Sequence, residues 1–331
     1  MNSNKRIFVL YTGGTIGMCR SEEGLRPDTA LVGKALQPFS DGLDFNWHVC
    51  EPLIDSSAVS LENWQNWLSV LAEKIPEYDG VIVLHGTDTL AYTANILALA
   101  LQGLDKPVVL TGSQWPFDEP DSDAPLNLAT AVAALNLAGL REVVIAFNGK
   151  IYPAVGSCKV STEDAAGFDN PHFGASGCWS AEQGWTALNI RPSEKTGGGL
   201  QVLPLDARAK VVCYTLVPGF SAQAVSDGLK TTDADAAVLQ SYGHGNAPAD
   251  EKFIQAVRRF TANGGLLLNI SQVKKGCAAA VYAQGSALRQ AGVVNGGKAN
   301  LETAAALLTL AVSGKWNTVK LYEKLVNLGL A

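Results

Sequence analysis

Short apolar runs alternate with longer amphipathic segments in the first half of the chain. Helical spacing predicts helices at 60–75, 89–103 and 125–139, the first with Ser60 as N-cap and Asn63 in place of the usual Glu of a capping box. Uninterrupted apolar runs that close on Gly, Ser or Thr are typical of buried strands, and they occur at 6–12, 79–87, 106–113 and 142–149. This alternation predicts an α/β fold whose parallel sheet is covered by helices on both faces.

Residues 191–207 interrupt this pattern with three consecutive glycines, two prolines and several polar residues. Such a composition is typical of a linker between domains. A second alternation follows, with apolar runs at 210–219, 235–245 and 264–272 and helical patterns at 286–294, 301–314 and 316–329. We therefore expect an N-terminal α/β domain at 1–190, a linker at 191–207 and a smaller α/β domain at 208–331.

Composition narrows the class of protein. The 331 residues are 47% hydrophobic and 17% charged, as in ordinary globular proteins. The net charge of −6, with Lys and Arg scattered rather than clustered, argues against nucleic acid as a partner. No apolar segment approaches the roughly 18 residues that a membrane helix needs, so we expect no membrane association.

Cysteine and histidine spacing argues against disulfides and metal sites. The six cysteines lie far apart without a CxxC pair, and the apolar run near the N-terminus is too short for a secretory signal. The four histidines show no ligand spacing with one another or with cysteine. These features predict a cytoplasmic protein with reduced thiols and no bound metal.

Four strand-end loops are the first places to look for chemistry, because ligands of an open parallel sheet bind beyond the carboxyl ends of its strands. They are "TGGTIG" (12–17), "IDSSAV" (54–59), "HGTDT" (85–89) and "TGSQWP" (111–116). The first loop has neither the spacing of a dinucleotide fingerprint nor that of a phosphate-binding P-loop. By itself it reads as a glycine turn in which Thr15 caps a helix.

The loop at 85–89 changes that interpretation. It also follows a buried strand, and it presents Thr87 next to Asp88, although Thr and Asp are also ordinary helix caps. Together the two loops offer two hydroxyls, a carboxylate and bare backbone amides at Gly13, Gly14 and Gly86. This combination suits a small zwitterionic ligand, with Asp88 on its ammonium group and Ser56 with glycine amides on its carboxylate.

A threonine nucleophile needs a base. His85 stands at a strand end, where a structural hydrogen bond is the more common role of histidine. Lys159 lies in "GSCKVSTEDAAGFDNP" (156–171), a segment rich in Ser, Thr, Gly and Asp, and a partly desolvated lysine near Asp88 can accept a proton. Composition alone, however, favours a solvated surface lysine at this position.

The motifs occur in the order seen in bacterial-type L-asparaginases, and the resemblance runs from about residue 6 to about residue 300. The sequence is most similar to the cytoplasmic type I branch of that family. The motifs that carry the resemblance are "YTGGTIG", "DSS", "HGTDT", "TGSQ", Ser122–Asp123 with Asn127–Leu128, "DAAGFDNP" and "SYGHGNAP" (241–248).

The resemblance implies hydrolysis of L-asparagine to L-aspartate and ammonia, with weaker glutaminase activity and no cofactor. It implies a flavodoxin-like N-terminal domain and a homodimer or dimer of dimers. Thr15 would be the nucleophile, and Thr87, Asp88 and Lys159 would relay protons, with Asp88 also on the substrate ammonium. The substrate-binding positions would be Gly14, Asp55, Ser56, Ser57, Gly86, Ser113 and Asn246, the last reaching the active site of a neighbouring subunit.

One position departs from the family pattern. Many members carry a tyrosine in the loop after the first strand, paired with the nucleophile, whereas this chain has Leu25 there. Either another tyrosine, such as Tyr282, activates Thr15, or the Thr87 cluster carries more of that work. The segment 18–27 still has the glycine, proline and charged residues of a mobile lid.

Three other readings compete with an asparaginase. A binding protein for acidic or amidated amino acids would use the same pocket without turnover. A nucleotide-dependent enzyme would need a glycine fingerprint that this chain lacks. A tRNA-dependent amidotransferase subunit shares the motifs but usually has an extra N-terminal domain, whereas the first strand here is expected at about residue 6.

Overall fold

The computed structural model describes residues 4–21, 24–190, 199–279 and 283–331. The chain divides into two compact units, Met1–Val202 and Leu203–Ala331. This division lies within the range 191–207, which the sequence marks as a linker. Residues 191–198 of that range are outside the described residues.

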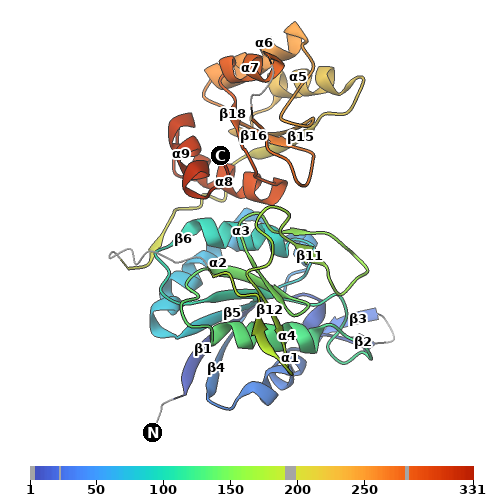
Figure 1. The fold of residues 1–331 in the computed structure, drawn as a ribbon, viewed down its shortest axis with the longest axis vertical. Helices are drawn as coiled ribbons and strands as arrows, with labels where there is room; N and C mark the ends of the chain where they lie inside the picture. The colour runs from blue at the N-terminus through green and yellow to red at the C-terminus, as the bar shows by residue number, and fades with distance from the viewer. Residues whose placement is uncertain (1–3, 22–23, 191–198, 280–282) are drawn as a thin grey trace. The chain divides into compact units, whose positions relative to one another are not determined.

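The first unit is built on an eight-stranded sheet with the order β13-β12-β9-β8-β7-β5-β1-β4 (Figure 1). Strands β4, β1, β5, β7 and β8 are parallel, and their chain order 2-1-3-4-5 is that of flavodoxin-like folds. The strands are β1 (Lys5–Tyr11), β4 (Leu43–Val49), β5 (Gly80–Leu84), β7 (Val108–Thr111), β8 (Val143–Phe147), β9 (Lys150–Pro153), β12 (Gly177–Ser180) and β13 (Gly184–Thr186).

Three antiparallel strands that the apolar pattern did not predict extend one edge of this sheet. β9 pairs with β8, β12 with β9, and β13 with β12. The reversal begins at Asn148 and Gly149, which both have positive φ, as a two-residue hairpin turn requires. The sheet is therefore parallel-dominated, as expected, with an antiparallel edge.

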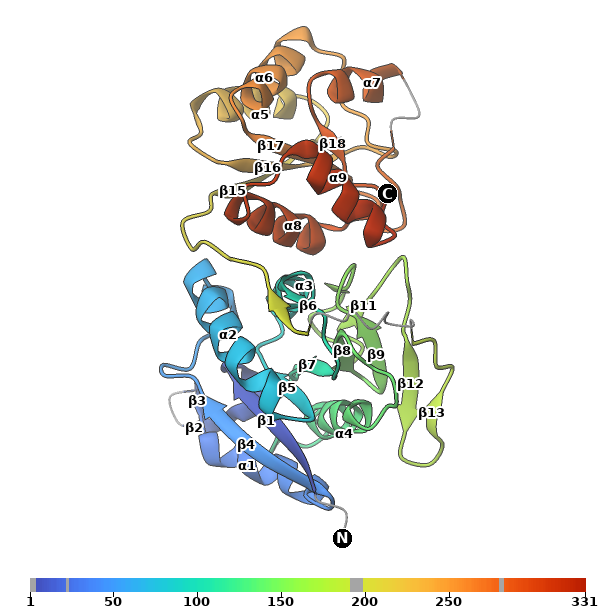
Figure 2. The same ribbon diagram turned by 90° about the vertical axis from the view of Figure 1, so that its left-hand side faces the viewer.

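Helices cover both faces of the sheet, as the sequence pattern predicted (Figure 2). Helices α2 (Leu61–Lys74) and α3 (Leu90–Ala100) pack together on one face, and α1 (Thr29–Leu36) and α4 (Ala124–Leu135) on the other. The capping box of α2 is confirmed: the Asn63 N–H donates to Ser60 Oγ at 3.3 Å, and the Ser60 N–H donates to Asn63 Oδ1 at 2.8 Å.

Short elements complete the first unit. β2 (Met18–Ser21) and β3 (Gly24–Pro27) pair as a hairpin in the segment expected to form a lid, and residues 22–23 between them are outside the described residues. The other short elements are the 3-10 helices η1 (Thr15–Gly17), η2 (Gln37–Phe39), η3 (Ser56–Ala58) and η4 (Ile75–Glu77), and the paired strands β10 (Cys158–Lys159) with β11 (Phe168–Asp169) and β6 (Leu101–Gln102) with β14 (Gln201–Val202).

The second unit contains a four-stranded parallel sheet in the order β15-β16-β17-β18. Helices α5, α6 and α7 lie on one side of this sheet and α8 and α9 on the other (Figure 1). The helix predicted at 286–294 corresponds to α7, which ends earlier, at Gln290, because Gly292 turns the chain with positive φ. The elements are β15 (Val211–Thr215), β16 (Ala236–Ser241), β17 (Leu266–Ser271), β18 (Val294–Asn295), α5 (Ser221–Thr231), α6 (Glu251–Ala262), α7 (Ala283–Gln290), α8 (Leu301–Ser313) and α9 (Thr318–Asn327).

Candidate active site

The candidate site lies where the strand order of the first unit reverses. The chain goes from β1 outward to β4 and then returns across β1 to β5, so the loops after β1 and β5 diverge at this switch point. Thr12 joins the two strand ends, because its N–H and its Oγ1–H both donate to the Leu84 carbonyl, at 3.0 and 2.9 Å. The loops after β1 and β5 therefore begin at neighbouring backbone positions that these hydrogen bonds hold together.

Glycines allow three of the strand-end loops to touch. A Cβ on Gly13 would lie 2.3 Å from the Ile54 carbonyl oxygen, and a Cβ on Gly14 would lie 2.5 Å from the Gly86 nitrogen. A Cβ on Gly86 would in turn lie 2.5 Å from Ser56 Oγ. Gly13 and Gly14 also have φ values of 129° and 103°, which side chains disfavour. The two loops that carry Thr15 and Thr87 are therefore in backbone contact.

Lys159 meets Thr87 and Asp88 in a hydrogen-bonded cluster. Its Nζ donates to Thr87 Oγ1 at 2.8 Å and to Asp88 Oδ1 at 2.8 Å. Only 17% of the lysine side chain is exposed, whereas Asp88 is 61% exposed. Composition favoured a solvated surface lysine at this position, and that prediction is wrong. The strand β10, paired with β11, places Lys159 against Thr87 in the loop after β5.

Gln114, from the motif "TGSQ", is a further member of this cluster, and its role did not follow from the sequence. Its Oε1 accepts a hydrogen bond from Thr87 Oγ1 at 3.2 Å. Its Nε2 donates to the carbonyl oxygens of Ser161 and Asp164 at 3.0 and 3.2 Å. The only available signal was its position, directly after Ser113 at the end of a buried strand.

Buried Asp123 holds the backbone of the loop at 111–116, which carries Gln114. Its carboxylate accepts from the Gln114 N–H at 3.0 Å, the Trp115 N–H at 3.1 Å and Asn127 Nδ2 at 2.9 Å. Burial raises the pKa of Asp123, and these hydrogen bonds oppose the rise. Ser113 is buried in the same loop, where its hydroxyl donates to the Trp115 carbonyl.

His85 is a structural residue, as its strand-end position suggested. Nδ1 lies 2.8 Å from the Gly86 carbonyl, which can only accept, so Nδ1 carries the proton. Nε2 lies 2.9 Å from Thr93 Oγ1, whose oxygen also accepts from Trp64 Nε1. Complete burial lowers the pKa of His85 to about 4 and keeps the ring neutral.

The loop at 54–59 presents the serines expected at the substrate carboxylate. Asp55 Oδ1 accepts from both the N–H and the hydroxyl of Ser57, each at 2.9 Å, which orients Ser57 at the surface. Ser56 is buried, and its carbonyl accepts from Thr89 Oγ1 at 2.7 Å. This hydrogen bond therefore ties the loop at 54–59 to the loop at 85–89.

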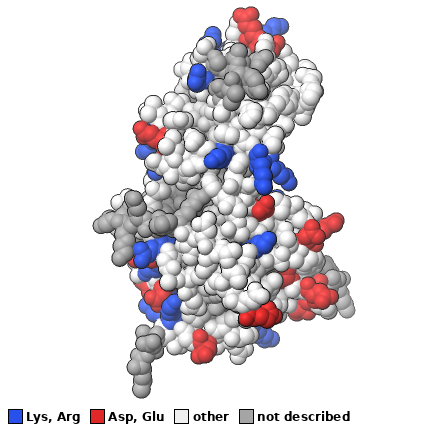
Figure 3. Space-filling view, viewed as in Figure 1, with Lys and Arg blue, Asp and Glu red and all other residues white. Residues whose placement is uncertain are grey.

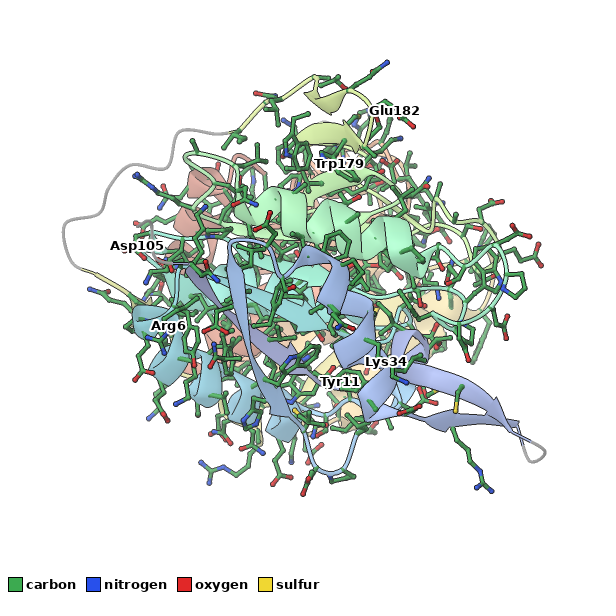
Figure 4. The ribbon with its side chains drawn as sticks, turned by 90° about the horizontal axis from the view of Figure 1, so that it is seen from below. Arg6, Tyr11, Lys34, Asp105, Trp179 and Glu182 are labelled. Carbon is green, nitrogen blue, oxygen red and sulfur yellow. The ribbon has the colours of Figure 1, made fainter. Side chains whose placement is uncertain are left out.

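Thr15 opens the 3-10 helix η1 and is half-buried. Two residues further along, a Cβ on Gly17 would come within 1.9 Å of the buried Tyr11 hydroxyl, so glycine is required at position 17. Figure 4 shows Tyr11 beside helix α1, which carries Lys34. Within the described residues Tyr11 Oη has no hydrogen-bond partner, and burial together with Asp28 raises the pKa of Tyr11 to about 12.

Three other residues discussed from the sequence are not part of the strand-end loops of the first unit. Asn246 belongs to the second unit, where its backbone bridges Tyr242. Leu25 pairs with Arg20 across the β2–β3 hairpin. Tyr282 is outside the described residues.

Comparison with known proteins identifies the family. Residues 6–191 match the family described as "Asparaginase, N-terminal", and residues 210–323 match "Glutaminase/Asparaginase C-terminal domain". The chain belongs to the asparaginase family. This membership confirms the resemblance drawn from the motifs.

Individual relatives of this asparaginase-family chain match it along nearly its whole length. It is 35% identical to L-asparaginase 1 of Escherichia coli K12 over 320 residues, which cover 95% of this chain and 94% of that protein. The crystal structure of L-asparaginase I from Vibrio cholerae superposes with a TM-score of 0.87 at 30% identity, covering 97% of both chains. The thermostable L-asparaginase from Thermococcus kodakarensis gives a TM-score of 0.86 at 27% identity, covering 97% of this chain and 96% of that one.

On the face shown in Figure 3, acidic and basic side chains are scattered among mostly uncharged residues. None of the helices in the described ranges is both long and apolar enough to cross a membrane.

Proposed function

We propose that this chain hydrolyses L-asparagine to L-aspartate and ammonia, with Thr15 as the nucleophile and weaker activity on L-glutamine. The Lys159–Thr87–Asp88 cluster, next to the Gly14–Gly86 contact, carries the proposal. A half-buried hydroxyl, a largely buried amine and bare backbone amides on adjoining loops are what acyl transfer from a carboxamide requires.

The reaction would have two steps. Thr15 Oγ attacks the side-chain carbonyl carbon of asparagine, the C–N bond breaks, and the proton lost by Thr15 ends on the leaving ammonia through the Lys159 cluster. Backbone N–H groups near Gly86 or Ser113 stabilise the oxyanion. Water then attacks the acyl carbon, the bond to Thr15 Oγ breaks, and aspartate is released. No cofactor or metal takes part in these steps.

The amino-acid groups of the substrate would be held by the surrounding loops. Asp88 receives the α-ammonium group, because a carboxylate has acceptor sites beyond the one that Lys159 occupies. Ser56 and Ser57, oriented by Asp55, and the amide of Gly14 receive the α-carboxylate. Distinguishing asparagine from glutamine then depends on one methylene, worth roughly 1–3 kcal/mol.

The working form would be a cytoplasmic homodimer or dimer of dimers. Residues 1–190 would form the catalytic domain and 208–331 a second domain that carries Asn246. In this arrangement Asn246 of one subunit completes the active site of its neighbour. A lone subunit would then have an incomplete pocket.

Ammonia release from L-asparagine tests the chemistry. Thr15→Ala should lower kcat by more than about 10³-fold, because no other group replaces the nucleophile, and Thr87→Ala should lower it strongly as well. Thr231→Ala, at the exposed end of α5, is the matched control and should leave turnover unchanged.

Two results would contradict the proposal in different ways. Near-wild-type turnover by Thr15→Ala would refute the assignment of Thr15 as the nucleophile but not the proposed asparaginase activity. Saturable binding of asparagine by the wild type without any ammonia would instead make the chain a binding protein.

A further inference from the structure

The Gln114 side chain is held in one orientation by its surroundings. Nε2 faces two carbonyl oxygens, those of Ser161 and Asp164, which only a donor can satisfy. The backbone of Gln114 is fixed as well, because its N–H donates to the carboxylate of buried Asp123. A Cβ on Gly167 would lie 2.8 Å from Nε2, so the amide occupies space that a side chain at position 167 would take. Oε1 is therefore directed at Thr87.

This orientation determines where the proton of Thr87 points. A hydroxyl has one proton and two lone pairs. The proton is donated to Gln114 Oε1 at 3.2 Å, and one lone pair accepts from Lys159 Nζ at 2.8 Å. One lone pair remains, so Thr87 can accept one further hydrogen bond but cannot donate one.

We infer that Gln114 is a positioning residue for the second half of the reaction, an inference that rests on the proposed amidohydrolase function. By taking the proton of Thr87, it makes Thr87 Oγ1 the acceptor that orients the attacking water. The water oxygen bonds to the acyl carbon, the bond from that carbon to Thr15 Oγ breaks, and the proton lost by the water ends on Thr15 Oγ. Gln114 itself touches neither substrate nor water.

A near-isosteric apolar variant tests the inference through the two kinetic constants. In Gln114→Leu the Thr87 hydroxyl loses its acceptor, so its O–H can rotate toward the water and no longer presents only a lone pair to it. Deacylation therefore slows, whereas acylation does not. We expect kcat to fall about tenfold, the effect of one lost hydrogen bond, with kcat/KM within about twofold of wild type. Added hydroxylamine, a stronger nucleophile than water, should speed ammonia release by the variant more than by the wild type.

A second variant tests the same point without removing polarity. The carboxylate of Gln114→Glu can accept from Thr87 but cannot donate to Ser161 and Asp164. Protonation restores one donor, so the ratio of variant to wild-type kcat should rise as pH falls from 8 to 5. Gln255→Leu, on the exposed face of α6, is the matched control and should behave as wild type.

The outcomes separate the two proposals. If the wild type releases no ammonia from L-asparagine, the proposed function fails and the role of Gln114 fails with it. If the wild type is active but Gln114→Leu keeps its kcat, or loses kcat and kcat/KM in equal proportion while its thermal unfolding is unchanged, only the inference about Gln114 is overturned.

Discussion

His85 fixes the start of the loop that carries Thr87, because its Nδ1–H donates to the Gly86 carbonyl and its Nε2 accepts from Thr93 Oγ1. Trp67 packs edge-on against the same ring, with centroids 5.5 Å apart. A proton on Nε2 would turn the acceptor of the Thr93 bond into a second donor at a fully buried position. The neutral ring is therefore part of the folded structure.

The low pKa of His85 predicts loss of stability in acid. Between pH 6.5, the ordinary pKa of histidine, and a pH of about 4, His85 is protonated in the unfolded chain but neutral in the folded chain. The stabilisation is complete above pH 6.5 and is lost as pH falls toward 4. Urea unfolding should give roughly 2 kcal/mol less stability at pH 5 than at pH 7.5 from this residue alone.

Two variants isolate this contribution. His85→Gln should unfold more easily at pH 7.5 and show a smaller loss of stability between pH 7.5 and 5. His48→Gln, at an exposed position on β4, should keep the wild-type dependence. Equal pH dependence in wild type and His85→Gln would show that other groups cause the acid sensitivity.

Single residues of the site were predictable to different degrees. Thr15, Thr87 and Asp88 stand in strand-end loops whose position follows from the apolar runs before them. Lys159 is separated from Thr87 by more than seventy residues, and only the hydrogen bonds in the folded unit join them. The Gln114 amide could not be assigned, because its role depends on two backbone carbonyls that no sequence pattern specifies.

At the level of elements, prediction succeeded where the burial pattern was uniform. β1, β5, β7 and β8 are central strands buried on both faces, so their sequences are continuous apolar runs. β4 at the sheet edge is mostly half-buried or exposed and mixes Asp, Asn and His with apolar residues. A strand of this kind carries no continuous run and was not predicted.

The capping box of α2 gives an element-level prediction. Ser60→Ala removes the acceptor of the Asn63 N–H and should cost about 1 kcal/mol of unfolding free energy, measured by urea denaturation. Ser69→Ala, on the exposed face of the same helix, should stay within about 0.5 kcal/mol of wild type. Equal unfolding free energies for Ser60→Ala and Ser69→Ala would mean that water satisfies the Asn63 N–H as well as the Ser60 hydroxyl does.

At the level of the whole molecule, the proposed sharing of Asn246 between subunits predicts complementation. Thr15→Ala and Asn246→Ala subunits should each be weakly active alone. Co-expressed with different tags, they should form mixed dimers in which one site has both residues intact. Random pairing would restore about one quarter of wild-type activity. Recovery no greater than the sum of the two variants would place Asn246 in its own subunit's site or outside any site.

The sequence by itself determined the α/β class, the two regions of strand–helix alternation, the family and the loops that hold the threonines, because buried strands and glycine turns leave local patterns. The strand order 2-1-3-4-5 agrees with the flavodoxin-like domain that the family resemblance implied, whereas only the tertiary structure decided the antiparallel edge, the hydrogen-bond geometry between Lys159 and Thr87, and the contact of Gln114 with Thr87. These features depend on contacts between segments distant in the chain, and the free energy of such contacts comes from burial and hydrogen-bond geometry that exist only after folding.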